Sequence, residues 1–379
     1  MREGEKVSRT FEVREREQRR EQVVALVPAH NEEALIGDTV SSLFGQTRRP
    51  DRVIVIADNC TDRTPEIAAE AGAEIFFTRA NRDKKAGGLN QALAQVLPGM
   101  EESGFVLVMD GDSRLAPGFI EAALAAMGPD VGAAGGIFLA ARTSNLVEYL
   151  QHNEYVRYSR EISRSRKQAK VITGTGSLFR AAALAQVAGA RESGVIPGGL
   201  AQVYDTLALT EDNELTLALK TLGWRCVSPK ECVVMTDVMP SWAKLWTQRM
   251  RWQRGAFENL KAYGFTRATA PYIGKQAFMG VGTLAISMLL FITLLAAYAG
   301  ALSFQPFWAA LGGIFLVERI VTAFRGGKVS VVIAAVLVVE FAYDLLQQAV
   351  YVKCLADMVL GRSTSWGGNH AGIEGSVRS

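Results

Sequence analysis

Short apolar runs alternate with helical patterns through the first third of the chain. Up to Phe44, and again from about Ala86 to Leu97, apolar residues recur at the three-to-four-residue spacing of a helix that is buried on one face. Four apolar runs have strand length: VVALVP (Val23–Pro28), VIVIA (Val53–Ala57), AEIFF (Ala73–Phe77) and FVLVMD (Phe105–Asp110). Strands that alternate with helices are typical of a parallel sheet, so we predict an α/β domain here.

Polar turns follow the predicted strands. His30-Asn31-Glu32-Glu33 comes after the first strand, Asp58 ends the second, and Asp110-Gly111-Asp112 stands at the end of the fourth. Ligands of open α/β sheets bind beyond the carboxyl ends of the strands. We therefore expect these turns to meet at one edge of the sheet and to line a single cleft.

More helices are predicted in the middle of the chain. Helical patterns cover Asn145–Lys170, which is rich in Tyr and Arg, and begin again near Ala181 after the strand and turn VITGTGSLFR. Another helix begins at Thr210-Glu211-Asp212 and ends before Gly223. The segment Trp242–Phe257 carries Trp and Arg at helical spacing, which is typical of a helix in a membrane interface.

The last third of the chain is predicted to enter the membrane. The stretch 277–298 has about 22 residues without a charge, enough to cross ~30 Å of hydrocarbon at 1.5 Å per residue. The stretches 306–324 and 329–352 are also long enough to span, although both carry acidic residues, which are unusual inside a span.

Basic residues indicate the orientation of these spans. Arg267 and Lys275 precede the first span, and Arg325 and Lys328 lie between the second and the third. The loop 300–305 has no charge. Because basic residues concentrate on the cytoplasmic side, we predict an integral protein of the cell membrane with its α/β domain in the cytoplasm. Three crossings would place the tail after Arg362 outside the cell.

Charge and cysteine content narrow the function classes. The net charge of +3 is too small for a nucleic-acid-binding face, and no zinc-finger or RNA-binding signature is present. The four cysteines have no C-x-x-C spacing, which favours reduced, structural thiols. Nucleic acid is therefore not an expected partner.

The first residues differ from the rest of the chain. Residues 1–22 interleave Arg and Glu with few apolar residues, so they have no apolar core of a secretory signal. A solvated tail or a docking segment fits this composition. We expect a charged tail at 1–22, a cytoplasmic domain with interfacial helices at 23–262, and a membrane domain with a C-terminal tail at 263–379.

Acidic and basic residues at the predicted cleft suit a nucleotide and a cation. Asp110 and Asp112 directly follow a buried strand, where carboxylates can reach a hard divalent cation or a ribose, although an Asx-rich turn has the same pattern. Asp58 can bind a nucleobase or ribose, or cap a helix. Lys85 precedes two glycines at a helix start, which favours a phosphate, although a solvated surface lysine is the common alternative.

Two later motifs offer groups for a second substrate. Asp212, with Glu211 beside it, stands at a helix start and suits either a general base for an acceptor hydroxyl or a cap. Gln248, Arg251 and Trp252 form Q-x-x-R-W, in which Arg can bind a diphosphate and Trp can stack on a sugar ring. An interface helix without a catalytic part also fits. The complete set is far more specific than any one member.

In order and approximate spacing, these motifs resemble those of family 2 glycosyltransferases, in particular the cellulose, hyaluronan and poly-N-acetylglucosamine synthase branch. The matching segments are VPAHNEE (Val27–Glu33), ADNCTD (Ala57–Asp62), KAGGLN (Lys85–Asn90), the D-x-D at Asp110, TGTGSLFR, TED (Thr210–Asp212) and QRMRW (Gln248–Trp252). The resemblance covers about Val23–Leu260 and is looser in the membrane part.

The resemblance implies a GT-A (Rossmann-like) catalytic domain followed by an interfacial helix and C-terminal transmembrane helices. It also implies an inverting, metal-dependent enzyme that uses Mg²⁺ or Mn²⁺. On the donor side, the resemblance implies Asp58 at the uracil, Lys85 at the phosphates, Asp110 at the nucleotide and Asp112 as the metal ligand. It implies Asp212 as the base, with Glu211 in the substrate site beside it, and Gln248, Arg251 and Trp252 at the diphosphate and acceptor. The implied acceptor site is lined by Thr175 and Gly176, with Ser177.

The implied reaction transfers a sugar, N-acetylglucosamine or glucose, from a UDP-sugar to a growing glycan. Membrane lipids would surround the enzyme. The small membrane part departs from the branch and favours an alternative, transfer of one sugar to a lipid or polyprenyl phosphate. A binding protein without turnover is a third reading, whereas an oxidoreductase lacks its G-x-G-x-x-G. Ser365–Gly368 is similar to a gating loop of the branch. Self-association and partner membrane subunits are both compatible with the sequence.

Overall fold

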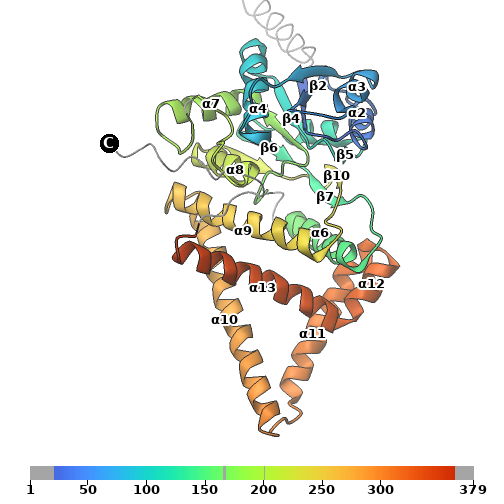
Figure 1. Cartoon of the computed structure of the whole chain (residues 1–379), viewed down its shortest axis with the longest axis vertical. Helices are drawn as coiled ribbons and strands as arrows, with labels where there is room; N and C mark the ends of the chain where they lie inside the picture. Colours follow the sequence, from blue (N-terminus) through green and yellow to red (C-terminus); the bar gives the residue numbers. More distant parts are fainter. Residues whose placement is uncertain (1–20, 165–167, 200, 363–379) are drawn as a thin grey trace, which may run out of the picture.

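The computed structural model describes residues 21–164, 168–199 and 201–362. An α/β domain lies on a layer of three helices, α6, α9 and α13, and two long helices, α10 and α11, extend from the opposite side of that layer (Figure 1). Almost all of the predicted charged tail 1–22, and all of Ser365–Gly368, lie outside the described residues.

A seven-stranded sheet forms the centre of the α/β domain, in the order β3-β2-β1-β4-β8-β6-β9. Its strands are β1 (Val23–Ala29), β2 (Arg52–Ala57), β3 (Glu74–Phe77), β4 (Phe105–Val108), β6 (Val131–Gly135), β8 (Ser177–Arg180) and β9 (Arg225–Val227). All seven residues of β1 are buried, as expected of a central strand covered on both faces. The α/β class predicted from the sequence is confirmed.

The sheet is mixed, which corrects the prediction of a parallel sheet. Strands β1 to β4 are parallel to one another, but β8 runs antiparallel to both β4 and β6. Ser177, the first residue of β8, pairs with Val108, the last residue of β4. The loop before β8 therefore lies at the same edge as the D-x-D turn after β4.

Helices cover both faces of this sheet. They are α2 (Ile36–Phe44), α3 (Thr64–Glu70), α4 (Lys84–Val96), α5 (Phe119–Ala126), α7 (Ala181–Glu192) and α8 (Glu211–Thr221), with a 3-10 turn at Leu97–Gly99. A second 3-10 turn, Phe324–Gly326, lies in the membrane part. Two buried apolar clusters, one on each side of the sheet, form the core. A second sheet of three strands, β5 (Arg114–Leu115), β10 (Val233–Thr236) and β7 (Ile137–Ala140), continues the domain toward the helical layer.

The remaining helices form the layer and the membrane part. They are α6 (Leu146–Arg164), α9 (Trp242–Tyr263), α10 (Ala270–Tyr298), α11 (Pro306–Ala323), α12 (Lys328–Ala335) and α13 (Leu337–Val359). Among the described residues, α10 and the stretch Pro306–Gly326 are each long and apolar enough to cross a membrane, and only 6% and 11% of their most apolar windows are buried. The predicted spans at 277–298 and 306–324 coincide with them.

The predicted third span, 329–352, is not one straight helix. The chain breaks at Val336, which has ψ +77°, and α12 and α13 meet at an angle of 83°. Beyond the break, Glu340 and Asp344 pair with arginines, and α13 runs alongside α9 (Figure 1). The buried Glu340 pairs with Arg157 of α6 on the catalytic side, and the half-buried Asp344 pairs with Arg319 of α11, so the bend brings both carboxylates to basic partners.

Candidate active site

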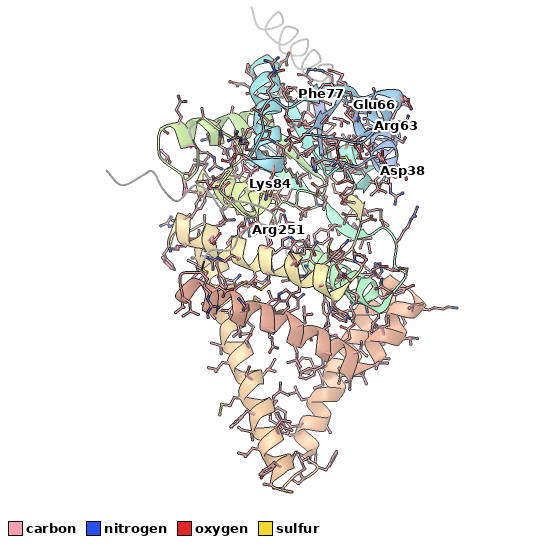
Figure 2. All side chains as sticks on the ribbon, in the orientation of Figure 1. Asp38, Arg63, Glu66, Phe77, Lys84 and Arg251 are labelled. Carbon is pink, nitrogen blue, oxygen red and sulfur yellow. The ribbon has the colours of Figure 1, made fainter. Side chains whose placement is uncertain are left out.

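A cavity of about 1040 Å³ lies between the sheet edge, α6 and α9. Predicted site residues from five distant segments line it: Lys85, Asp110, Asp112, Thr175, Glu211, Asp212, Gln248, Arg251 and Trp252. Lys84, at the start of α4, faces Arg251 of α9 from the other side of this space (Figure 2). Asp58 and Gly176 are not among the lining residues.

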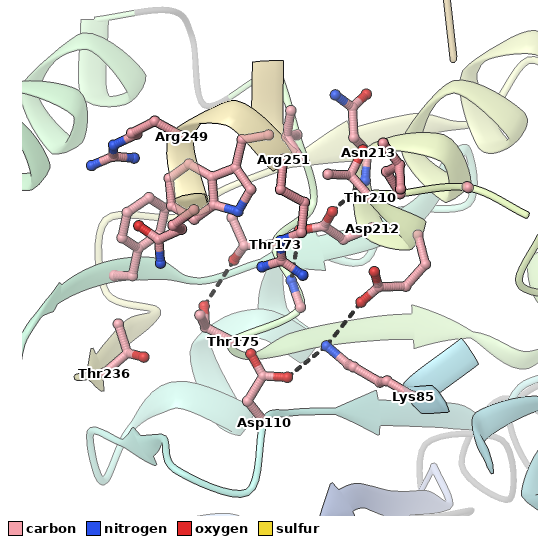
Figure 3. Close-up of a pocket in the computed structure, with 18 of the residues that line it drawn as sticks. Lys85, Asp110, Thr173, Thr175, Thr210, Asp212, Asn213, Thr236, Arg249 and Arg251 are labelled. Carbon is pink, nitrogen blue, oxygen red and sulfur yellow. Dashed lines mark hydrogen bonds and ion pairs between the residues drawn. The ribbon is translucent and has the colours of Figure 1, made fainter. Parts of the chain in front are cut away.

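Lys85 joins the D-x-D turn to the start of α8. Its Nζ lies 2.5 Å from Asp110 Oδ1 and 3.1 Å from Glu211 Oε1 (Figure 3). Burial alone would lower the pKa of Lys85, but the charges of Asp110 and Glu211 outweigh it and raise this pKa well above its ordinary value. The lysine is therefore a fixed positive charge between two predicted substrate-binding carboxylates.

Carboxylates gather on the other side of the D-x-D turn. Burial, then the charge of Asp110, raises the pKa of Asp112 to about 6. Burial, then Asp112 and Asp110, raises the pKa of Glu32 to about 7. The Asp237 carboxylate adds to the shift at Asp112. Mutual repulsion among oxygen ligands at one place is the condition that a hard divalent cation relieves.

The donor set fits a cation that arrives with a phosphate ligand. Among the residues that the structure describes, no group of three or more His, Cys, Asp or Glu side chains is arranged to hold a metal by itself. Mg²⁺ keeps several waters and is usually held by one or two carboxylates together with substrate phosphates. Asp112 and its neighbour Asp110 meet that smaller requirement.

Asp212 lies in the first turn of α8, where backbone groups hold its carboxylate. Oδ1 accepts a hydrogen bond from Asn213 N at 2.7 Å, and Oδ2 accepts one from Gly174 N at 3.3 Å (Figure 3). Burial, then the charge of Glu211, raises the pKa of Asp212 to about 6. A carboxylate with this pKa, facing a cavity, can accept a proton near neutral pH.

The glycines of TGTGSLFR allow this close packing. A Cβ on Gly174 would lie 2.5 Å from Lys85 Nζ, and one on Gly176 would lie 2.9 Å from Leu115 Cδ2 and Val234 Cγ2. Gly176 therefore packs behind the loop against apolar side chains, while Thr175 faces the cavity and its hydroxyl lies 3.0 Å from that of Thr173. Thr175 therefore lies where an acceptor in the cavity could contact it, whereas Gly176 does not.

Asp58 lies beside the cavity and is held by side-chain donors. Its Oδ1 accepts from Asn81 Nδ2 at 2.8 Å and from Thr78 Oγ1 at 2.9 Å. The same Asn81 amide donates to Lys84 O at 2.7 Å, and Lys84 has φ +53°, an uncommon value for lysine. Asn81 was not predicted from the sequence. The Asn-Arg-Asp turn before Lys85, an Asx-turn pattern, is the signal that could have indicated it.

Helix α9 contributes several side chains to the cavity, Arg249 among them, and these point in different directions (Figure 3). Gln248, Arg251 and Trp252 line the cavity, and the buried Gln248 Oε1 has no hydrogen-bond partner among the described residues. Arg249 points away from Arg251 (Figure 3) and lies 2.8 Å from Glu154 Oε2 of α6, with its guanidinium 4.4 Å from the centre of the Trp252 ring. Arg249 thus supports the ring of Trp252, a role that the Q-x-x-R-W spacing did not indicate.

Helix α9 also packs tightly on the start of α8. A Cβ on Gly255 would lie 2.4 Å from Thr210 Oγ1, and Asn259 Nδ2 donates to Thr210 O and Oγ1 at 3.3 Å. One helical turn therefore separates Trp252 from the contact that fixes α9 against the turn before Asp212. The helix that carries Q-x-x-R-W therefore contacts the TED motif one turn beyond Trp252.

A family model described as "Glycosyltransferase like family 2" matches residues 20–255. The chain belongs to this family. Poly-beta-1,6-N-acetyl-D-glucosamine synthase of Staphylococcus aureus is 26% identical over 249 residues, which are 63% of this chain and 56% of that protein. The Bacillus subtilis protein named "Probable glycosyltransferase YdaM" is 28% identical over 253 residues, covering 62% and 54%. The chain spans about half the length of these curated relatives. The predicted membership in family 2 is confirmed.

A solved structure extends the likeness of this family 2 glycosyltransferase into the helical part. Mannosyltransferase PcManGT from Pyrobaculum calidifontis, in complex with GDP-Man and Mn²⁺, aligns with a TM-score of 0.59 at 17% identity, over 91% of this chain and 89% of that one. At this identity the likeness concerns the fold alone. It confirms the predicted GT-A (Rossmann-like) domain with C-terminal helices long and apolar enough to span a membrane.

Proposed function

We propose that this family 2 glycosyltransferase transfers a sugar from a UDP-sugar to a growing glycan, with inversion at the anomeric carbon. The observation that carries the proposal is the ion-paired contact of Lys85 with both Asp110 and Glu211, which joins a nucleotide-binding turn to the start of the helix that bears Asp212. The S. aureus relative is named as a synthase of an N-acetylglucosamine polymer, which favours N-acetylglucosamine as the sugar, with glucose as the alternative.

In this mechanism the chain supplies binding, charge and a base. Asp58 binds the uracil, and Lys85 and Arg251 neutralise the two phosphates from opposite sides of the cavity. The acceptor oxygen attacks the anomeric carbon, its proton passes to Asp212, and the bond from that carbon to the diphosphate oxygen breaks to release UDP. Gln248 and Trp252 hold the diphosphate and the acceptor sugar, and Thr175 lies at the acceptor side.

Asp112 would hold a Mg²⁺ or Mn²⁺ ion, with Asp110 contacting the nucleotide or the same ion. When bound, the ion offsets the negative charge of the diphosphate. The raised pKa of Asp112, caused by burial and by Asp110, supports a cation at this place. Lys85 Nζ donates to Asp110, and because an ammonium group has three N–H donors it can also reach a phosphate.

We assign residues 23–262 to the cytoplasmic catalytic domain and 263–379 to the membrane domain. The basic residues before α10 and after α11 support this orientation, since both ends of the α10–α11 pair carry them on the side of the catalytic domain. A second candidate is transfer of one sugar to a lipid or polyprenyl phosphate, which the described helices long and apolar enough to span a membrane favour. Self-association or partner membrane subunits would enlarge the membrane part.

The direct test uses detergent-purified, full-length protein, a panel of UDP-sugars and GDP-mannose, and measurement of the released nucleotide. We expect UDP release from one UDP-sugar in the presence of Mn²⁺ or Mg²⁺ and its loss on adding a chelator. Release from GDP-mannose alone would contradict the role of Asp58 at uracil, and no release from any donor would contradict the enzyme assignment. Product length then separates a polymer from a single transfer.

The rate should fall at acid pH because the base must be ionised. The pKa of Asp212 is raised to about 6, so its carboxylate is mostly charged above that pH and mostly protonated below it. We expect kcat, measured with saturating donor and Mn²⁺, to decrease tenfold per pH unit below about 5. Saturating metal keeps protonation of the Asp112 carboxylate from producing the same fall. A flat profile between pH 5 and 7 would argue against Asp212 as the base.

Gly255→Ala should weaken catalysis by displacing α9 from α8. The added methyl would meet Thr210 Oγ1 at 2.4 Å, and overpacking of this kind costs about 1–3 kcal/mol. Because Arg251 and Asp212 lie on the two helices, we expect kcat for UDP release to fall about ten- to a hundredfold. Gly189→Ala, on α7 with no atom within 4 Å of the new Cβ, is the matched control.

A second substitution distinguishes displacement from general damage. Thr210→Ala removes the clashing hydroxyl, so the double variant should be no slower than Thr210→Ala alone. If the losses in kcat of the two single variants multiply in the double variant, the contact between positions 255 and 210 is not the cause.

A further inference from the structure

Helix α13 runs in a different direction from the two long apolar helices. It follows α12 after a bend of 83° and passes alongside α9, across the upper ends of α10 and α11 (Figure 1). An orientation along the catalytic layer is unexpected for the continuation of a span, since the span predicted at 329–352 would run roughly beside α10 and α11. The side chains of α13 indicate what this orientation serves.

One face of α13 is apolar and exposed. Its exposed apolar residues recur at helical spacing along the whole helix: Val338, Phe341, Ala342, Ala349, Val352, Leu355, Ala356 and Val359. Val338 and Val359, near the two ends, have 77% and 80% of their surface exposed. A single stripe of this kind over six turns is the pattern of a helix that lies between an apolar and a polar environment.

The opposite face of α13 is polar and is occupied by the catalytic side of the molecule. Glu340, 1% exposed, accepts hydrogen bonds from Asn153 Nδ2 at 3.1 Å and Arg157 Nη1 at 3.0 Å, both on α6. The Tyr343 hydroxyl donates to Glu154 Oε2 at 2.5 Å. These bonds fix which face of α13 points toward the catalytic domain and which points away from it.

Charged partners also mark the level at which α11 leaves an apolar environment. Arg319, in the last turns of α11, lies 3.2 Å from Glu340 Oε2 and 2.5 Å from Asp344 Oδ2 of α13. Ion pairs of this kind are expensive in the centre of a bilayer and are usual near its surface. The end of α11 and the first half of α13 therefore belong to the same shallow level.

We infer that α13 lies in the plane of the membrane surface, with its apolar stripe on the lipid acyl chains and its polar face against α6 and α9. The described part of the chain then crosses the bilayer twice, through α10 and α11, and Arg362 is on the same side as the catalytic domain. Lipid is the occupant of the stripe because α10 and α11, which extend from the layer that contains α13, expose almost all of their apolar surface (Figure 1). Helices of this type bury their apolar face about 5–10 Å deep.

Spin-label depth measurements distinguish this arrangement from a third crossing. Single cysteines would replace Val338, Ala349, Val352 and Val359 in full-length protein whose four native cysteines are substituted, reconstituted in lipid nanodiscs and checked for retained nucleotide binding. Collision with oxygen and with a water-soluble nickel chelate gives the depth of each label. Labels at Leu284 and Phe291 on α10 calibrate the scale.

A surface helix predicts four similar, shallow depths, within about 5 Å of one another. A crossing helix predicts a change of about 31 Å between positions 338 and 359, at 1.5 Å per residue. A monotonic change, or a maximum along α13, would overturn the inference. Labels shielded from oxygen and nickel alike would overturn lipid as the occupant and indicate a second protein surface.

Sidedness is measured independently with a membrane-impermeant maleimide on sealed vesicles. Arg362→Cys should react from the same side as Glu66→Cys, which lies on the exposed surface of the catalytic domain, and Ser303→Cys from the opposite side. Reaction of Arg362→Cys from the side of Ser303→Cys would contradict two crossings. Neither measurement depends on turnover, so loss of sugar transfer and loss of this topology are separately detectable.

Discussion

Asp212→Asn should lower the rate of sugar transfer by about 10²- to 10⁴-fold, which is the usual contribution of a general base. Asparagine keeps an oxygen to accept the bond from Asn213 N at 2.7 Å, so the start of α8 is preserved while the proton acceptor is lost. The measurement is kcat for UDP release, together with the dissociation constant for UDP, which should change little.

Glu192→Gln is the matched control for this variant. It removes one carboxylate from the exposed end of α7, away from the cavity, and should leave kcat unchanged. If Asp212→Asn kept more than a tenth of the normal kcat while remaining folded, another group would have to be the base. Binding without turnover in the unmodified protein would instead favour the inactive, nucleotide-binding alternative.

Asp112→Asn should remove the part of nucleotide affinity that depends on metal. A direct ligand contributes at least as much as the outer partners of metal ligands, whose loss costs about 10- to 100-fold in metal affinity. We expect the dissociation constant for UDP in Mn²⁺ to rise by that factor and to become equal to the value in chelator. Calorimetric titration with UDP in both conditions measures this without turnover.

The chelator condition also serves as the internal control for Asp112→Asn. UDP affinity without metal should be the same in the variant and the unmodified protein, because Lys85 and Arg251 remain. Asp38→Asn, an exposed carboxylate that pairs with Arg114, provides the matched removal of charge. Unchanged Mn²⁺ dependence in Asp112→Asn would move the predicted metal ligand to another carboxylate.

The sequence was most informative where one rule of sheet topology applied. Asp110 and Asp112 end a buried strand and line the cavity as this rule predicts, whereas Asp58 and the turn His30–Glu33 are not among its lining residues. The position of Thr175 followed a different rule. It reaches the same edge because β8 runs antiparallel, and hydrophobic patterning does not distinguish strand directions.

Features that depend on close contact between distant segments could not be predicted. Position 255 requires glycine because Thr210, just before α8, leaves no room for a Cβ there. Arg249 is held against Trp252 because it pairs with Glu154 on α6. No proline or glycine stands at the break at Val336, so no helix-breaking residue indicates it in the sequence. In each case the deciding partner is more than 40 residues away or is a tertiary interaction, which local spacing does not encode.

The polar contacts between α13 and α6 have a practical consequence for anyone who would shorten this chain. A soluble fragment that stops at residue 262 would expose Asn153 and Arg157 without their carboxylate, and would leave Glu154 without the Tyr343 hydroxyl. Helix α6 would keep its contacts with β7 and with Arg249 of α9, but its face toward α13 would be uncovered. Because α13 follows the two apolar helices in the chain, covering this face requires the membrane part and therefore detergent or lipid.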